Sequence, residues 1–211
     1  MRRHSLLFAS FILYAASSAS ADTAYDVSVD TSSIAGTVGS LDFQFNPGPL
    51  VSQSASLQIL NFTSDGTLVP PAFPTGDVTG TLPSTLTFDN GSGFNDYFQG
   101  FTFGSSLAFN VSLFGPALSS PDGVSTSGST FAFSMFADAA GTQPVLTSDT
   151  TDGFASVVTV NLDGSTTVTN FSPQATLASA SVAPVPEPRG TVLLIAAMTA
   201  LLVSLRSRHR A

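Results

Sequence analysis

The chain has 211 residues, 14 acidic against 6 basic, and a formal net charge of −8 at pH 7. All six basic residues are arginines close to the two ends, so residues 22–188 contain every acidic residue but no Lys, Arg, His, Cys or Trp. The lack of cations excludes a nucleic-acid-binding role, and the lack of Cys and His excludes thiol nucleophiles, Ser–His dyads, disulfides and the usual zinc sites.

Residues 1–21 have the three parts of a secretory signal peptide. Two arginines precede a short apolar segment, and the small residues Ala19 and Ala21 follow it in the spacing of a cleavage site. A buried N-terminal helix is the alternative, but the basic flank and the small residues favour a signal peptide. We therefore predict export through the Sec translocon and a mature chain that begins at Asp22.

Alternation of apolar and polar residues recurs along the chain after the signal peptide and predicts β-strands. In chain order, the predicted strands are 41–45, 57–62, 97–103, 107–113, 131–135 and 158–162. The alternation breaks within 57–62, which predicts a bulge there. Turn sequences separate the strands, and Asp163-Gly164 between VVTVNL and STTVTNF predicts a hairpin.

Strands without helical crossovers favour an all-β fold. We predict an antiparallel β-sandwich of jelly-roll type, formed as one domain by residues 22–182. The 18 phenylalanines, most of them at alternating positions, are expected to fill its core. An exposed aromatic stripe for stacking on sugars is the alternative, which the absence of Trp disfavours.

Aspartate is the one abundant ionisable side chain of the domain, so carboxylate pairs are the catalytic chemistry left open. No Asp-Thr-Gly or Asp-Ser-Gly triplet of the aspartic-protease kind occurs. Most aspartates stand beside Gly, Asn, Pro or Ser, which predicts turns where the carboxylate accepts backbone N–H groups. We therefore predict no enzymatic activity and no catalytic residue.

The sequence DNGSGFND, residues 89–96, is a candidate calcium-binding loop. Asp89, Asn95 and Asp96 offer the carboxylate and amide oxygens that Ca²⁺ prefers, although glycines stand where an EF-hand has ligands. A polar turn without metal is the alternative, in which case the protein has no cofactor. Asp149 and Asp152 form a weaker candidate of the same kind.

The charge of the domain predicts how its stability depends on pH. With 13 aspartates and no cation to pair with them, the carboxylates are expected to lie on the surface and to repel one another. Such repulsion would raise their pKa values in the folded state, so mild acid should stabilise the domain.

The C-terminal segment 183–211 begins with APVPEP, which predicts an extended spacer because proline lacks an N–H. The uncharged residues 190–205 predict a helix of about 24 Å, short against a hydrocarbon core of about 30 Å. The positive-inside rule keeps Arg206, Arg208 and Arg210 in the cytoplasm and the domain outside. We therefore predict a single-pass inner-membrane precursor; a buried core helix is the alternative.

The order of these features resembles a known sorting signal. Val185, Pro186, Glu187 and Pro188, then a short apolar helix and an arginine cluster, resemble the PEP-CTERM signal of proteins exported by Gram-negative bacteria. The resemblance implies cleavage near the motif by an exosortase, a membrane-embedded protease, and transfer to the cell surface or extracellular matrix. It also implies a setting rich in extracellular polysaccharide, which is a candidate partner.

Two stretches of the domain, one beginning YDVSVD at Tyr25 and one beginning FDNGSGF at Phe88, resemble a recurring bacterial PEP-CTERM protein family. This resemblance implies the same export route and lends no activity. We therefore predict an exported, non-enzymatic protein of the cell surface or extracellular matrix. The alternative is a calcium-assisted carbohydrate-binding module on the same sandwich.

Overall fold

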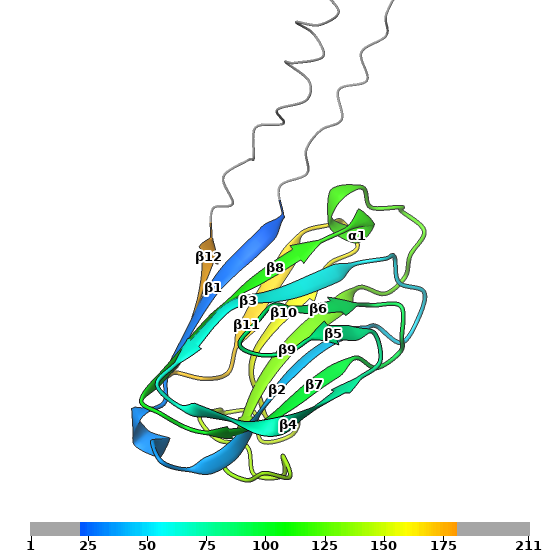
Figure 1. The fold of residues 1–211 in the computed structure, drawn as a ribbon. Coiled ribbons are helices and arrows are strands. Elements are labelled where there is room, and N and C mark those ends of the chain that lie inside the picture. The colour runs from blue at the N-terminus through cyan, green and yellow to red at the C-terminus, as the bar shows by residue number, and fades with distance from the viewer. Residues whose placement is uncertain (1–21, 181–211) are drawn as a thin grey trace, which may run out of the picture.

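The computed structural model describes residues 22–180, which form an all-β body of two antiparallel sheets (Figure 1). This confirms the predicted all-β class and its two-sheet architecture. The helical elements of this part of the chain are η1 (Ser32–Ile34) and α1 (Pro116–Ser119). Neither of them, nor any other helix within 22–180, is long and apolar enough to cross a membrane.

The predicted export signals fall outside the described residues. This holds for the signal peptide, the Pro-rich spacer and the apolar helix, and so for Ala19, Ala21, Val185, Pro186, Glu187, Pro188, Arg206, Arg208 and Arg210. Asp22, the predicted first residue of the mature chain, is the first residue described and is exposed.

Each sheet has six strands. The first contains, in spatial order, β12 (Ala175–Ala180), β1 (Thr23–Asp30), β8 (Ser106–Phe114), β3 (Ser56–Ser64), β6 (Leu86–Asp89) and β5 (Val78–Gly80). The second contains β11 (Thr166–Asn170), β10 (Phe154–Val160), β9 (Ser129–Phe136), β2 (Val38–Pro47), β7 (Asp96–Thr102) and β4 (Thr67–Thr75). From β1 to β4 the chain passes from one sheet to the other at every connection, so the core is built from residues distant in sequence.

Phenylalanine side chains fill the space between the sheets. On β2, Leu41, Phe43 and Phe45 alternate with polar residues and are fully buried. The Phe43 ring contacts Phe109 of the opposite sheet at a centroid distance of 5.2 Å and Phe133 of β9 at 5.0 Å. The buried phenylalanines of this core are Phe43, Phe45, Phe62, Phe88, Phe101, Phe103, Phe109, Phe131 and Phe133. The predicted role of these rings in the core is confirmed.

The predicted bulge lies in β3. Its register with β8 shifts between Leu60 and Thr63, and Asn61 between them has a positive φ of 53°. Asn tolerates this left-handed conformation better than most residues. The irregularity keeps Phe62 buried although the alternation of the strand is broken.

The predicted hairpin at Asp163-Gly164 joins β10 to β11. Val160 pairs with Thr166, and Gly164 adopts a φ of +81°, which glycine reaches without strain. The predicted strand 158–162 is too long, because β10 ends at Val160 and the Leu162 side chain is 51% exposed in the turn. A loop with a left-handed glycine needs these extra residues between its strands.

The two ends of the described domain lie side by side. β1 and β12 are antiparallel neighbours with Ala24 opposite Ala180, so residues 22 and 180 lie at the same end of the sandwich (Figure 1). β1 finishes at Asp30 at the opposite end, where η1 follows it. The loops at that end are therefore the part of the domain farthest along the strands from both attachment points.

Candidate functional site

Aspartates in turns accept hydrogen bonds from neighbouring backbone and hydroxyl groups, as the sequence predicted. Asp65, between β3 and β4, accepts bonds from the Ser105 hydroxyl at 2.6 Å, the Ser105 N–H at 3.0 Å and the Ser106 N–H at 2.9 Å. Led by the Ser105 hydroxyl, these donors lower the pKa of Asp65 to about 2. The carboxylate ties the β3–β4 turn to the start of β8.

Five more turn aspartates behave in the same way. Hydrogen bonds from hydroxyl or backbone N–H groups of the same turn lower the pKa values of Asp30, Asp122, Asp138, Asp149 and Asp163. The expectation that repulsion raises the pKa of the surface carboxylates is therefore wrong for these residues, because local donors stabilise the ionised form.

The loop 89–96 is held by its own asparagine. Asn95 is fully buried, and its Oδ1 accepts a bond from the Asp77 N–H at 2.8 Å. Its amide nitrogen donates to the Phe45 carbonyl at 2.9 Å and to the Ser92 carbonyl at 3.0 Å. All the hydrogen-bonding capacity of the amide nitrogen thus goes into fixing the loop against β2.

The other two calcium candidates have different partners. Asp89 accepts a hydrogen bond from the Ser56 hydroxyl of β3, whereas the side chain of Asp96 lies beside Asp42 of β2. The structure therefore does not gather Asp89, Asn95 and Asp96 around one point. Within the described residues, no group of three or more Asp, Glu, His or Cys side chains is placed to hold a metal.

The structure brings together two aspartates that the sequence did not pair. Asp42 lies opposite Phe98 in the register of β2 and β7, and Asp96 lies opposite Gln44. Asp42 and Asp96 are therefore diagonal neighbours on the outer face of the second sheet, and their carboxyl groups are within hydrogen-bonding reach. We call these two residues the carboxyl pair.

A line of polar side chains continues from the carboxyl pair along β2. The Gln44 amide nitrogen donates to Asp42 Oδ2 at 2.7 Å, and the Asn46 amide nitrogen donates to Gln44 Oε1 at 3.2 Å. Asn46 Oδ1 in turn accepts the Asn95 N–H at 2.6 Å. One oxygen of Asp42 is thus satisfied by a line of amides that reaches the loop 89–96.

One oxygen of each carboxyl group in the pair lacks a donor. Asp42 is only 8% exposed, and its Oδ1 and the Oδ1 of Asp96 are buried without a hydrogen-bond partner. Burial, followed by the hydrogen bond and the charge of Asp42, raises the pKa of Asp96 to about 9. The expectation that all carboxylates lie on the surface is therefore wrong for Asp42, which is buried on the outer face of β2 between its neighbours β7 and β9.

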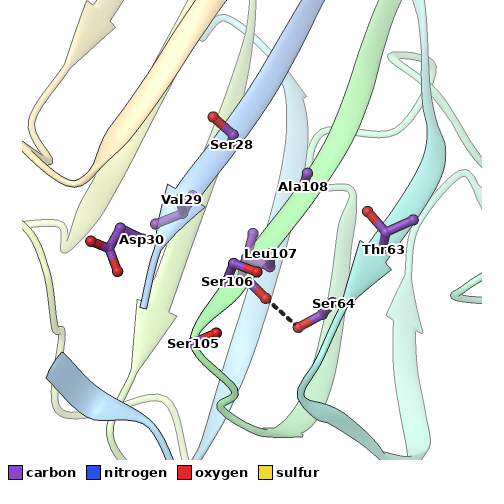
Figure 2. A pocket seen from close by; sticks show the side chains of 9 residues that line it. All are labelled: Ser28, Val29, Asp30, Thr63, Ser64, Ser105, Ser106, Leu107 and Ala108. Atoms are coloured by element: carbon purple, nitrogen blue, oxygen red, sulfur yellow. Dashed lines mark hydrogen bonds between the residues drawn. The ribbon is translucent and has the colours of Figure 1, made fainter. Parts of the chain in front are cut away.

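A groove lies at the end of the sandwich opposite residues 22 and 180. It has a volume of about 590 Å³ and runs over the last residues of β1 and β3 and the first residues of β8 (Figure 2). Its lining residues are Ser28, Val29, Asp30, Thr63, Ser64, Ser105, Ser106, Leu107 and Ala108. The surface of the groove is rich in hydroxyl groups and contains no aromatic ring.

Several of the groove hydroxyls are already hydrogen-bonded within the protein. The Ser64 hydroxyl donates to the Ser106 carbonyl at 2.6 Å, the contact drawn in Figure 2. The hydroxyls of Ser28 and Thr176 lie 2.7 Å apart. A hydroxyl that donates one such bond keeps lone pairs free, so the groove offers mainly acceptors to a polar ligand.

Comparisons with protein-family models, with curated proteins and with solved structures find no match to this chain.

Proposed function

We propose that the protein is an exported, non-enzymatic component of the cell surface or extracellular matrix, sorted through its C-terminal PEP-CTERM-like segment. The observation that carries the proposal is the order Val185-Pro186-Glu187-Pro188, uncharged residues 190–205 and three arginines, behind a domain free of Lys, Arg and His. An exosortase-type membrane protease and the Sec translocon are the partners this route requires.

The bounds of the fold support this division of the chain. β1 begins at Thr23, directly after the proposed signal cleavage site, and β12 ends at Ala180, shortly before the Pro-rich spacer. The two-sheet body is thus complete between the segments proposed for removal. Because residues 22 and 180 lie at one end, a chain held by its tail would direct the opposite end and its groove away from the membrane.

Processing of the tail is the test of the sorting proposal. Full-length protein is expressed in a host with an active exosortase, recovered from the cell surface and measured by intact mass. We expect a species that begins at Asp22 and lacks Gly190–Ala211. A surface species that retains Gly190–Ala211 would mean that the tail is an ordinary anchor.

A matched pair of variants ties the cut to the motif. Glu187→Ala with Pro188→Ala should abolish processing and leave the protein in the inner membrane. Pro184→Ala, which changes a proline of the same spacer outside the motif, should be processed like the unmodified chain. Equal processing of both variants would mean that the motif does not direct the cut.

We infer further that the first eight strands form a jelly roll. The spatial orders β1-β8-β3-β6 and β2-β7-β4 have the double Greek-key pattern of that fold, with β5 attached to β6 rather than to β4. The strands β9 to β12 extend the two sheets beyond it. Jelly rolls include lectin domains, and this likeness together with the groove of Figure 2 favours the rival function, a calcium-assisted carbohydrate-binding module.

The rival function predicts glycan binding in the groove. Ala108→Tyr should fill the groove and abolish binding on a glycan array, while Ser112→Tyr, on the same face of β8 outside the groove, should not. Binding that also disappears with a chelator would establish the rival over a purely structural role. Glycan hydrolysis lost on a single Asp→Asn change would overturn the non-enzymatic proposal itself.

A further inference from the structure

The outer face of the second sheet carries two carboxyl groups whose negative charge no cationic side chain of the domain neutralises. Asp42 and Asp96 lie on neighbouring strands within hydrogen-bonding reach, and the whole stretch 22–188 contains no Lys, Arg or His. Two ionised carboxylates this close repel each other, and burial strengthens the repulsion. A positive partner must therefore come from the solvent.

The unsatisfied oxygens are the second observation. Asp42 is more than nine-tenths buried, and its Oδ1 has no donor, although its Oδ2 is bonded to Gln44. The Oδ1 of Asp96 is unsatisfied as well. A buried carboxylate oxygen left without a donor is strongly unfavourable, so such atoms usually mark a bound proton, water or ion.

We propose that Asp42 and Asp96 form a binding site for one hard divalent cation such as Ca²⁺. The site keeps Asp96 from the candidates predicted by the sequence and replaces Asp89 and Asn95 with Asp42. It is independent of the sorting proposal, since tail processing and cation binding are measured separately.

The surroundings supply further oxygen ligands and an approach. Thr75 is the register partner of Asp96 on β4 and lies on the same face, whereas Gln44, its partner on β2, directs its amide nitrogen to Asp42. Asp96 is only partly buried and Thr75 is exposed, so a hydrated ion reaches the pair from the side of β4. Two carboxylates with hydroxyl and water oxygens suit the flexible coordination of Ca²⁺ at affinities of about 10⁻⁴–10⁻³ M.

The cation competes with a proton. Burial and the neighbouring Asp42 raise the pKa of Asp96 to about 9, so at neutral pH one proton must leave before the ion binds. The neighbours from β4 and β9, Thr75 and Ser134, do not titrate. The segment 137–153, which contacts β2 at Ser40, contains Asp138, Asp149 and Asp152, and hydrogen bonds lower the pKa values of the first two. Because the ion and the shared proton exclude each other, apparent affinity should be higher at pH 8 than at pH 6.

Equilibrium dialysis with radioactive calcium tests the proposal on the full-length chain in detergent. We expect one ion per chain at pH 8. Asp42→Asn and Asp96→Asn should each weaken binding at least tenfold. In Asp96→Asn the amide can donate to Asp42 in place of the shared proton, so this variant keeps its fold, which circular dichroism verifies.

Two control variants separate this site from general charge effects. Asp26→Asn removes a strand aspartate of the other sheet that faces Asn110, and Asp89→Asn removes the candidate of the loop; both should bind as the unmodified chain does. No binding by the unmodified chain at any pH would leave a proton-sharing pair and overturn the proposal. Unchanged binding by Asp96→Asn, or loss in Asp89→Asn alone, would also overturn it.

Discussion

The turn aspartates and the carboxyl pair contain the same side chain in opposite electrostatic settings. Asp65 accepts three hydrogen bonds from the Ser105 and Ser106 groups and has its pKa lowered to about 2. Asp96 is partly buried beside a second carboxyl group and has its pKa raised to about 9. The difference shows that, in a domain without Lys, Arg or His, local donors rather than net charge decide the ionisation of these aspartates.

A third aspartate refines the comparison. Asp26 lies in β1 on the outer face of the first sheet, directly opposite Asn110 of β8, whose amide donates to it. Asp42 also lies mid-strand on an outer face, but its diagonal neighbour is another acid. An amide donor on the neighbouring strand can thus satisfy a mid-strand aspartate, and the carboxyl pair lacks such a donor for Asp42 Oδ1.

The largest predicted effect concerns pH. Because the folded-state pKa of Asp96 lies far above its value of 3.8 in the unfolded chain, the folded protein holds an extra proton between about pH 4 and pH 9. Stability should therefore rise as pH falls from 9 towards 5, by less than the ~1.4 kcal/mol per pH unit of one fully coupled proton, because Asp96 is partly exposed and screened by solvent. Below about pH 4 the turn aspartates reverse the trend, since the unfolded chain takes up their protons first. Urea denaturation followed by circular dichroism, with a chelator present, measures the curve.

Asp96→Asn isolates the contribution of the pair to that curve. The amide is neutral at every pH, so the slope between pH 6 and 9 should vanish. Stability at pH 8 should increase by on the order of 2 kcal/mol, an amount reduced from the full pKa shift for solvent screening at the exposed side of Asp96. The loss of stability below about pH 4, which comes from the turn aspartates, should stay unchanged. A stability that falls steadily from pH 7 to pH 4 in the unmodified chain would contradict the assignment of the raised pKa to the carboxyl pair.

The sequence predicts much of the fold because the alternation of apolar and polar residues shows directly which side chains of a strand are buried. The strands predicted at 41–45, 97–103, 107–113 and 131–135 coincide closely with β2, β7, β8 and β9. Alternating apolar residues must face one core, so their period determines the strand. β4 was not predicted, because it contains Pro70, Pro71 and Pro74, which are compatible only with its position at the sheet edge.

The carboxyl pair could not be predicted in the same way. Asp42 alternates with Leu41 and Phe43, which correctly places it on the outer face of β2, but outer-face residues are normally solvated. Its burial and its pairing with Asp96 depend on the register between strands more than fifty residues apart. Register and loop packing are long-range properties that alternation does not encode.

The smaller effect concerns the turn that Asp65 holds. Asp65→Ala removes the acceptor for the Ser105 hydroxyl and for two backbone N–H groups, so the Tm at pH 7 should fall. We expect its change in the free energy of unfolding to be smaller than the change that Asp96→Asn causes at pH 8. Because the folded pKa of Asp65 is about 2, its contribution is complete above the unfolded value of 3.8 and disappears as pH falls towards 2. The difference in Tm between variant and unmodified chain should therefore shrink between pH 7 and pH 2 in thermal melts followed by circular dichroism.

Asp152→Ala, which removes an exposed aspartate from another turn, is the matched control and should leave the Tm nearly unchanged at both pH values. If Asp152→Ala lowers the Tm as much as Asp65→Ala does, the hydrogen bonds to Asp65 are not what stabilises its turn.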